Sequence, residues 1–216
     1  VGKFNDLEGQ SDEAVACKDC GVGKYTSNDQ SACINCGVGK FSLEGQSNCK
    51  DCGVGKFNNV EGQANCKDCG VGKFNDLEGQ SDEAVACKNC GVGKFNDLEG
   101  QSDEAVACKD CGVGKYTSND QSACINCGVG KFSLEGQSNC KDCGVGKFNN
   151  VEGQANCKDC GVGKFNDLEG QSDEAVACKD CGVGKFNDLE GQSDEAVACK
   201  DCGVGKFNDL EGQSDE

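Results

Sequence analysis

Eleven Cys-x-x-Cys pairs, spaced 16, 17 or 21 residues apart, restrict what this sequence can fold into. All 22 cysteines belong to these pairs, and each pair is followed by Gly-Val-Gly-Lys and then Phe or Tyr. A short unit copied many times predicts a stack of small repeats, because no single unit can bury a core of its own. We therefore expect a linear array in which each unit touches only its neighbours.

A longer period lies on top of the short one. Residues 1–91 and 92–182 match at every position except one, where Asn89 stands against Asp180, and residues 183–216 begin a partial third copy. No shift in composition marks a boundary, so residues 1–216 are interpreted as one continuous tandem array. The sequence opens in the middle of a unit, and we expect it to be a piece of a longer protein.

The apolar content is too low for an ordinary hydrophobic core. Leu, Ile, Val and Phe make up less than a fifth of the residues, and the net charge is −17. Such a composition alone is typical of disordered chains. The 22 cysteines among 216 residues indicate instead a disulfide scaffold or a metal-cluster protein. Covalent or metal cross-links are therefore expected to hold the fold.

Composition also narrows the classes of function. The chain is acidic and has no Arg, so nucleic-acid binding is not expected, because each phosphate contact needs a cation. No apolar run approaches the roughly 20 residues of a membrane span. The sequence has no His to act as a general base. We expect no enzyme activity, no catalytic residue and no organic cofactor.

Within a unit the signals predict turns and short strands. The Gly-Val-Gly step suits backbone with positive φ, and Lys followed by an aromatic residue begins a short extended segment. A polar corner follows, such as residues 42–46, whose Gly suits a left-handed hairpin position. In the 21-residue units a longer return segment, residues 11–16 in the first, fits a turn of helix or a strand. The predicted fold class is small disulfide-rich repeats, with short β-hairpin units stacked into an elongated, solenoid-like rod that has little or no helix.

The few apolar side chains recur at fixed places. Each unit has one aromatic ring. We expect that ring to cover the sulfurs of its own unit, because the only large side chain in a unit is usually buried in its core. The Val of Gly-Val-Gly and the corner residues Leu7, Leu43 and Val60 are expected to seal contacts to the next unit. The alternative is that the aromatic rings form an exposed stripe for a ligand.

Two chemistries use cysteine pairs at this spacing. Four-cysteine zinc sites have overlapping spacing, but they would consume two pairs each, and uniform spacing gives no grouping into fours. A disulfide ladder from the second Cys of one pair to the first Cys of the next fits better and leaves Cys17 and Cys202 unpaired in this sequence. The predicted bonds are Cys20–Cys33, Cys36–Cys49, Cys52–Cys66, Cys69–Cys87, Cys90–Cys108, Cys111–Cys124, Cys127–Cys140, Cys143–Cys157, Cys160–Cys178 and Cys181–Cys199. First-to-first pairing and self-closed redox pairs are alternatives that a sequence leaves open.

The acidic corners are a weak candidate for metal binding. Asp6, Glu8, Asp12 and Glu13, with their copies, offer carboxylate oxygens of the kind that Ca²⁺ takes. Their spacing does not match an EF-hand loop, and a solvated acidic face is the default interpretation. Apart from Ca²⁺, no cofactor or metal is expected.

The motif as a whole carries a resemblance. The pattern of a cysteine pair, two residues, Gly-Lys and an aromatic residue, then Gly-Gln (Gly45-Gln46, Gly62-Gln63) and the next pair, resembles the ephrin-receptor-like repeats of the growth-factor-receptor Cys-rich group. That family commonly has Pro after the second Cys, where this chain always has Gly. The resemblance implies disulfides, secretion and an extended rod, but it implies no particular ligand.

These observations favour a structural protein. We expect an extracellular or cell-surface repeat that forms a rigid, disulfide-laddered rod, part of a filament or appendage, with copies of itself as partner. The alternative is an extracellular ligand-recognition module of receptor type, with a protein as ligand. An intracellular zinc-binding array is the third hypothesis.

Overall fold

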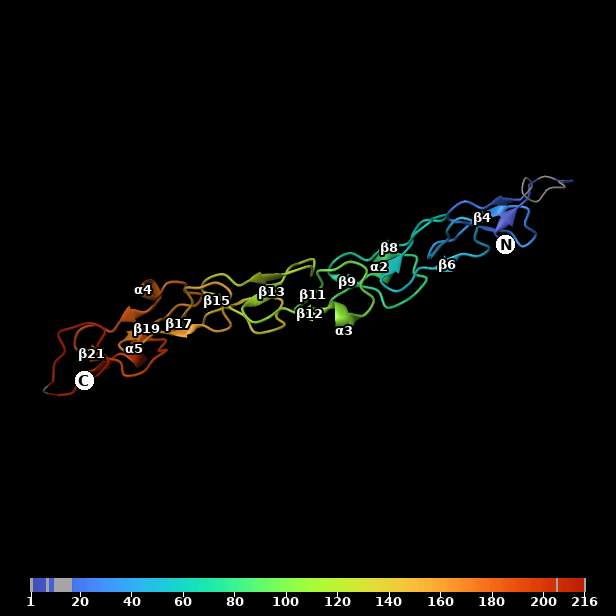
Figure 1. Cartoon of the computed structure of the whole chain (residues 1–216). Coiled ribbons are helices and arrows are strands. Elements are labelled where there is room, and N and C mark those ends of the chain that lie inside the picture. Colours follow the sequence, from blue (N-terminus) through green and yellow to red (C-terminus); the bar gives the residue numbers. More distant parts are fainter. Residues whose placement is uncertain (1, 7, 10–16, 205, 216) are drawn as a thin grey trace. The chain divides into compact units, whose positions relative to one another are not determined.

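The computed structural model describes residues 2–6, 8–9, 17–204 and 206–215. The chain forms two compact units. The first contains residues 1–91, 95–109 and 120–123, and the second contains residues 92–94, 110–119 and 124–216. Each unit is built from the same short elements, drawn in Figure 1 as small arrows and single-turn helices joined by irregular loops.

The repeated element is an antiparallel hairpin. Its first strand starts at the Lys that follows Gly-Val-Gly. Its second strand ends at the residue just before the second Cys of the next pair. In one example, Lys164 pairs with Asp180 and Phe165 pairs with Lys179. The first strands are β1 (Lys3–Phe4), β3 (Lys24–Thr26), β5 (Lys40–Phe41), β7 (Lys56–Phe57), β9 (Lys73–Phe74), β11 (Lys94–Phe95), β13 (Lys115–Thr117), β15 (Lys131–Phe132), β17 (Lys147–Phe148), β19 (Lys164–Phe165) and β21 (Lys185–Phe186).

Most second strands consist of the two residues between the cysteines of a pair, and β4 and β14 also include the first Cys. They are β2 (Lys18–Asp19), β4 (Cys33–Asn35), β6 (Lys50–Asp51), β8 (Lys67–Asp68), β10 (Lys88–Asn89), β12 (Lys109–Asp110), β14 (Cys124–Asn126), β16 (Lys141–Asp142), β18 (Lys158–Asp159), β20 (Lys179–Asp180) and β22 (Lys200–Asp201). The first unit holds the pairs β1–β2, β3–β4, β5–β6, β7–β8 and β9–β10. The second holds β13–β14, β15–β16, β17–β18, β19–β20 and β21–β22.

Glycine makes the turn before each first strand possible, and in most repeats also the corner after it. The second Gly of Gly-Val-Gly has positive φ, +77° at Gly163, and the turn is closed by a 3.2 Å hydrogen bond from Lys164 N to Gly161 O. The corner Gly170 has φ +69°. Both conformations disfavour a side chain, because Cβ would crowd the following carbonyl.

The longer repeats contain one turn of helix. These helices are α2 (Glu83–Ala86), α3 (Glu104–Ala107), α4 (Glu174–Ala177) and α5 (Glu195–Ala198). The Asp173 carboxylate caps α4 by accepting a 3.0 Å hydrogen bond from Ala175 N. Of the two conformations left open for the return segment, the helical turn is thus the one formed in these repeats, whereas residues 11–16 lie outside the described residues. The predicted class of disulfide-rich hairpin repeats with little helix is confirmed.

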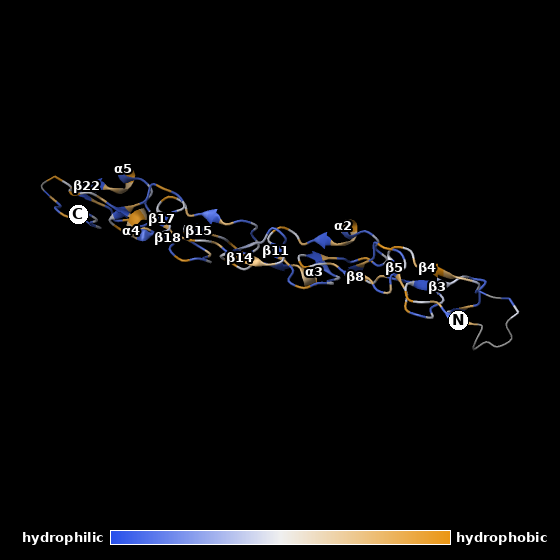
Figure 2. Cartoon of the chain, turned by 90° about the horizontal axis from the view of Figure 1, so that it is seen from above, coloured by the Kyte–Doolittle hydropathy of each residue, from blue (hydrophilic) through white to orange (hydrophobic). Residues whose placement is uncertain are grey.

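The interior is thin and partly polar. The buried apolar side chains are cysteines, four Phe rings and the Ala that ends each helix. The largest fully buried side chains are asparagines, among them Asn58, Asn75, Asn149 and Asn166. Figure 2 accordingly shows hydrophilic and hydrophobic residues alternating over short stretches of chain. Burial of apolar surface alone is therefore a small part of what holds each unit together.

Candidate functional site

Ten disulfides close successive segments, and each closed segment is called a repeat below. The Cα atoms of each bonded pair lie 5.4–5.7 Å apart, and 13 to 18 positions separate the two cysteines. The bonds join the second Cys of one pair to the first Cys of the next, the same ten pairs that the ladder scheme gives. Cys17 and Cys202 are free and partly exposed. Each disulfide thereby ties the residue before a Gly-Val-Gly turn to the loop side of the second strand, as at Cys33, which pairs with Thr26 in the β3–β4 hairpin.

The aromatic rings cover sulfurs, but not those expected. Phe148 is 3% exposed and packs against the Cys160–Cys178 disulfide and Ala177, which belong to the following repeat. Phe57, Phe74 and Phe165 do the same with the disulfides that follow them. The prediction that each ring covers its own unit's sulfurs was wrong for these four rings, which pack against the disulfide of the following repeat.

The aliphatic residues expected to seal the repeats lie at the surface. Val22 and Leu43 are 54% exposed, and Val60 is 48% exposed. Leu7 lies outside the described residues. The prediction that these side chains fill inter-repeat contacts was wrong, because backbone hydrogen bonds and asparagine side chains occupy those contacts instead.

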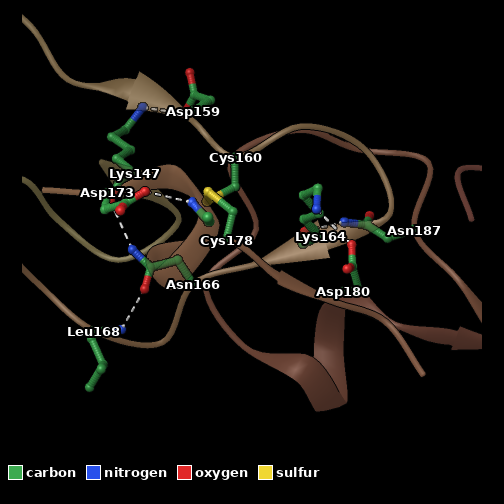
Figure 3. The surroundings of a disulfide bond; sticks show 11 residues. Lys147, Asp159, Cys160, Lys164, Asn166, Leu168, Asp173, Cys178, Asp180 and Asn187 are labelled. Carbon is green, nitrogen blue, oxygen red and sulfur yellow. Dashed lines mark hydrogen bonds and ion pairs between the residues drawn. A yellow bond between two sulfur atoms is a disulfide. The ribbon is translucent and has the colours of Figure 1, made fainter. Parts of the chain in front are cut away.

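An asparagine after the aromatic residue is the main link between repeats (Figure 3). Asn166 Nδ2 donates to Lys147 O of the preceding repeat at 2.8 Å, while Asn166 Oδ1 accepts from Leu168 N at 3.0 Å. The backbone N–H of Asn166 donates to Gln192 O of the following repeat, and its carbonyl accepts from Gly146 N of the preceding one. All four groups are satisfied although the side chain is 1% exposed. One residue thus joins three consecutive repeats.

The same arrangement recurs through both units. The Nδ2 group of the asparagine donates to the Lys carbonyl of the preceding repeat at 2.6–2.9 Å in each case, as does the Ser hydroxyl that replaces it at two positions. These residues are Asn58, Asn75, Asn96, Asn149, Asn166, Asn187, Asn208, Ser42 and Ser133. We call them the linker residues. Sequence reasoning missed them, although a signal existed: Asn, Ser or Thr follows the aromatic residue in every repeat.

Glycines bring the backbone of a third repeat into contact. Gly146 has φ +77°, and a Cβ there would collide with Gly191 O, which lies two repeats further along the chain. Gly39 meets Gly79 O in the same way within the first unit. The expectation that a repeat touches only its immediate neighbours is therefore too narrow. The Gly-Val-Gly step is needed for this close approach as well as for a turn.

The surface of most repeats carries Lys–Asp ion pairs. Within the described part of the chain, the ion pairs join Lys to Asp, as in Lys179–Asp167 at 2.7 Å and the cross-strand pair Lys147–Asp159. The hydrogen bond from Lys179 holds the pKa of Asp167 below its usual range. The hydroxyls of Ser27 and Ser31 lower the pKa of Asp29 to about 2. Exposed pairs of this kind contribute little stability each.

The predicted calcium ligands have other partners or fall outside the structure. The Asp6 carboxylate lies 3.2 Å from Lys18 Nζ, while Asp12 and Glu13 are not among the described residues. In the copy at residues 76–83, Asp76 pairs with Lys88. No group of three or more potential metal ligands occurs in the part of the chain that the structure describes. Calcium binding, Glu8 included, stays a prediction.

Successive hairpins leave shallow grooves between them. One groove of about 540 Å³ is lined by Phe132, Lys141, Asp142, Lys147 and Asn156, among others. One repeat earlier, a groove of about 400 Å³ has the equivalent lining, with Tyr116 in place of the Phe. These grooves offer an aromatic edge and amide and ammonium groups to a ligand.

Comparison with known families agrees with this geometry. The family model described as tyrosine-protein kinase ephrin type A/B receptor-like matches residues 39–84 and 130–174, which occupy equivalent places in the two long copies. No curated protein gave a match. No helix of the described residues is long and apolar enough to cross a membrane. The two matched segments consist of disulfide-closed hairpins, and these parts of the chain are similar to the Cys-rich repeats of ephrin type A/B receptors, an extracellular, receptor-like type of module.

Proposed function

We propose that this chain is a structural segment of a secreted or cell-surface protein, in which the repeats form a stiff, rod-like spacer. The observation that carries the proposal is the linker residue, exemplified by Asn166, which binds three consecutive repeats through four hydrogen bonds. Bending the array at any such point breaks several bonds at once, because side-chain and backbone groups of the same residue are engaged. The disulfides add a second restraint, since a loop of this size cannot unravel without reduction.

Self-association is the second part of the proposal. The copies at 1–91 and 92–182 are almost identical, so the same surface recurs at a fixed interval along the chain. That surface includes one strongly exposed Val in each helix, 68–73% exposed at Val85, Val106, Val176 and Val197. Equivalent apolar positions repeated along two chains can match one another in register, which favours a filament or bundle.

The experiment is small-angle scattering combined with sedimentation on the oxidised 216-residue chain at physiological salt. A stiff spacer gives the scattering of an elongated particle whose cross-section is constant, and self-association gives species heavier than one chain as concentration rises. Scattering typical of a flexible coil or a compact globule would contradict the spacer. Elongated monomers at every concentration would agree with the stiff spacer and would contradict self-association into a filament.

A recognition module is the second candidate, supported by the receptor-like family and by the grooves beside Phe132 and Tyr116. It predicts that a monomeric chain captures an extracellular protein with fixed stoichiometry. The variant Phe132→Ala would then weaken binding, while Val85→Ser, on an exposed helix that does not line these grooves, would leave it unchanged. The disulfides take up 20 of the 22 cysteines, so a zinc array is not proposed.

A further inference from the structure

The two repeats that contain Tyr differ from all others at the corner of the hairpin. These Tyr repeats are closed by Cys20–Cys33 and Cys111–Cys124. They lack the corner Gly, and a Gln takes the left-handed conformation instead, with φ +57° at Gln30 and +58° at Gln121. Within the described part of the chain, no other residue except Gly has positive φ. An L side chain strains this conformation, because its Cβ approaches the next carbonyl oxygen.

A second, independent difference concerns the linker residue. The Tyr repeats have Thr where the others have Asn or Ser. Thr117 is only 6% exposed, yet its Oγ1 has no hydrogen-bond partner, whereas Ser133 in the next repeat donates to Lys115 O at 2.6 Å. A buried hydroxyl without a partner loses its bonds to water and gains nothing in return. The other buried side-chain atom without a partner in the described part is Gln121 Oε1.

The hairpin of a Tyr repeat is itself well held. Its strands β3 and β4 have three residues each, where most other strands have two. In the loop between them, Ser27 Oγ donates to the Asp29 carboxylate, which also accepts from Ser31 Oγ at 2.8 Å. The strain and the unpaired groups therefore weaken the attachment of the repeat to its neighbour more than the repeat itself.

We propose that the Tyr repeats are built-in points of release, where the contact with the preceding repeat opens before any other contact while the hairpin and its disulfide stay intact. The sequence repeats such a point after 91 residues: the Tyr25 repeat shares the left-handed Gln, and in the Tyr116 repeat Thr117 Oγ1 also lacks a partner. Between these points the linker residues are Asn or Ser with all bonds made. The array would then yield at defined places under load and close again, since the disulfide keeps the released repeat folded. This inference does not depend on self-association.

The contact can be followed through a single amide. Asn96 N donates at 2.9 Å to Gln121 O of the Tyr repeat, and Asn75 N donates at 2.9 Å to Gln101 O of a repeat with a corner Gly. Cys-Lys-Asn-Cys occurs only at residues 87–90, so the peptide 87–96 has a mass that no other peptide of the same length shares. The segment around Asn75, in contrast, has identical copies elsewhere. Hydrogen exchange by mass spectrometry on the oxidised full chain, with reduction after quenching, can therefore separate the two amides.

The expected result is exchange at Asn96 about tenfold faster than at Asn75 and at the other linker asparagines whose N–H is bonded outside the Tyr repeats, which are Asn58, Asn149, Asn166 and Asn187, with slow exchange retained in the β13–β14 strands (Lys115–Thr117 and Cys124–Asn126). The double variant Thr117→Asn with Gln121→Gly should slow Asn96 to the rate of Asn75. Ser133→Asn, where the bond already exists, is the matched control and should leave Asn96 unchanged. Equal rates for the two amides in the unsubstituted chain would overturn the proposal, and so would a double variant that folds but leaves Asn96 fast. Loss of protection throughout the Tyr repeat would overturn it as well.

Discussion

A buried amide stands in this protein where most interiors have an aliphatic side chain. Asn166 is inaccessible to solvent. Its side chain bonds the carbonyl of Lys147 and the N–H of Leu168, and its own backbone N–H and C=O are also hydrogen-bonded. A polar group can be buried without penalty only when every partner is provided. The linker residues meet this condition because three repeats converge on each of them.

Replacing Asn166 with Ala is expected to cost about 2–3 kcal/mol, because two buried partners, Lys147 O and Leu168 N, are left without a bond. Urea unfolding of the oxidised chain followed by circular dichroism measures the loss. Asn166→Ser is the control, since Ser133 makes the carbonyl bond in its own repeat, and it should cost less than half as much. A loss as large for Ser as for Ala would contradict the role given to the side chain.

The two glycines of one Gly-Val-Gly step give a matched pair of substitutions. Gly146→Ala places a methyl group against Gly191 O in a left-handed conformation and is expected to destabilise the chain by about 3 kcal/mol. Gly144→Ala meets no atom within 4 Å and should change stability little. Thermal unfolding of the two variants under one condition makes the comparison, and similar midpoints would argue against the second-neighbour contact.

Asp29 provides a residue-level test by pH. Its pKa in the folded chain is lowered to about 2 by bonds from Ser27 and Ser31, against an ordinary value of about 3.9. Because the folded pKa is the lower one, the contribution to stability is complete above pH 4 and is lost as the pH falls toward 2. Carboxyl NMR should show the late titration, and Ser27→Ala should move the pKa of Asp29 upward. Titration near 4 in the unsubstituted chain would show that these bonds do not form.

At the scale of the element, each hairpin depends on the disulfide that closes it. The Cys160–Cys178 bond lies under Phe148 and Ala177, so it serves as the core of the contact as well as a tether. Replacing both cysteines with Ser is expected to cost about 3 kcal/mol on the chain-entropy model, with a further loss from exposing Phe148. Cys17→Ser, at a free cysteine, is the control and should be neutral. A double variant as stable as the control would mean that the hydrogen bonds alone hold the repeat.

Much of the element could be predicted from the sequence, because chain geometry leaves few choices. A cysteine pair, a Gly-x-Gly turn, a Lys-aromatic strand and a corner Gly define a hairpin locally, and among the described residues the structure has one wherever a further cysteine pair follows. The contacts could not be predicted in this way. Whether Phe148 covers the sulfurs of its own repeat or the next depends on where the first strand points, and the exposure of Val22 depends on which groups already fill the interface. Asn166 was missed because a polar residue next to a strand is normally taken for surface.

At the scale of the whole chain, the state of the sulfurs separates the structural hypotheses. The structure leaves two free cysteines, so the non-reduced, denatured protein should give about two thiols per 216 residues and no bound zinc. A non-reducing peptide map should recover the bonded pairs, and the Asn89 peptide identifies one of them without ambiguity. If all 22 cysteines were free thiols and zinc were bound in stoichiometric amount, the disulfide array would be contradicted and the zinc-binding hypothesis supported.

The length of the repeats varies in two places, both of them after the linker residue. The bonded cysteines are 13, 14 or 18 positions apart. One extra residue lies between the linker residue and the corner Gly in the 14- and 18-position repeats, and four more follow the corner Gln in the 18-position repeats, where α4 and its equivalents lie at the surface. The frame from Gly-Val-Gly to Asn166, which three repeats share, has constant length. Foreign peptides grafted at residues 172–176 would therefore be displayed without disturbing the frame, and a gene encoding such an array could gain or lose whole units while its product stays foldable.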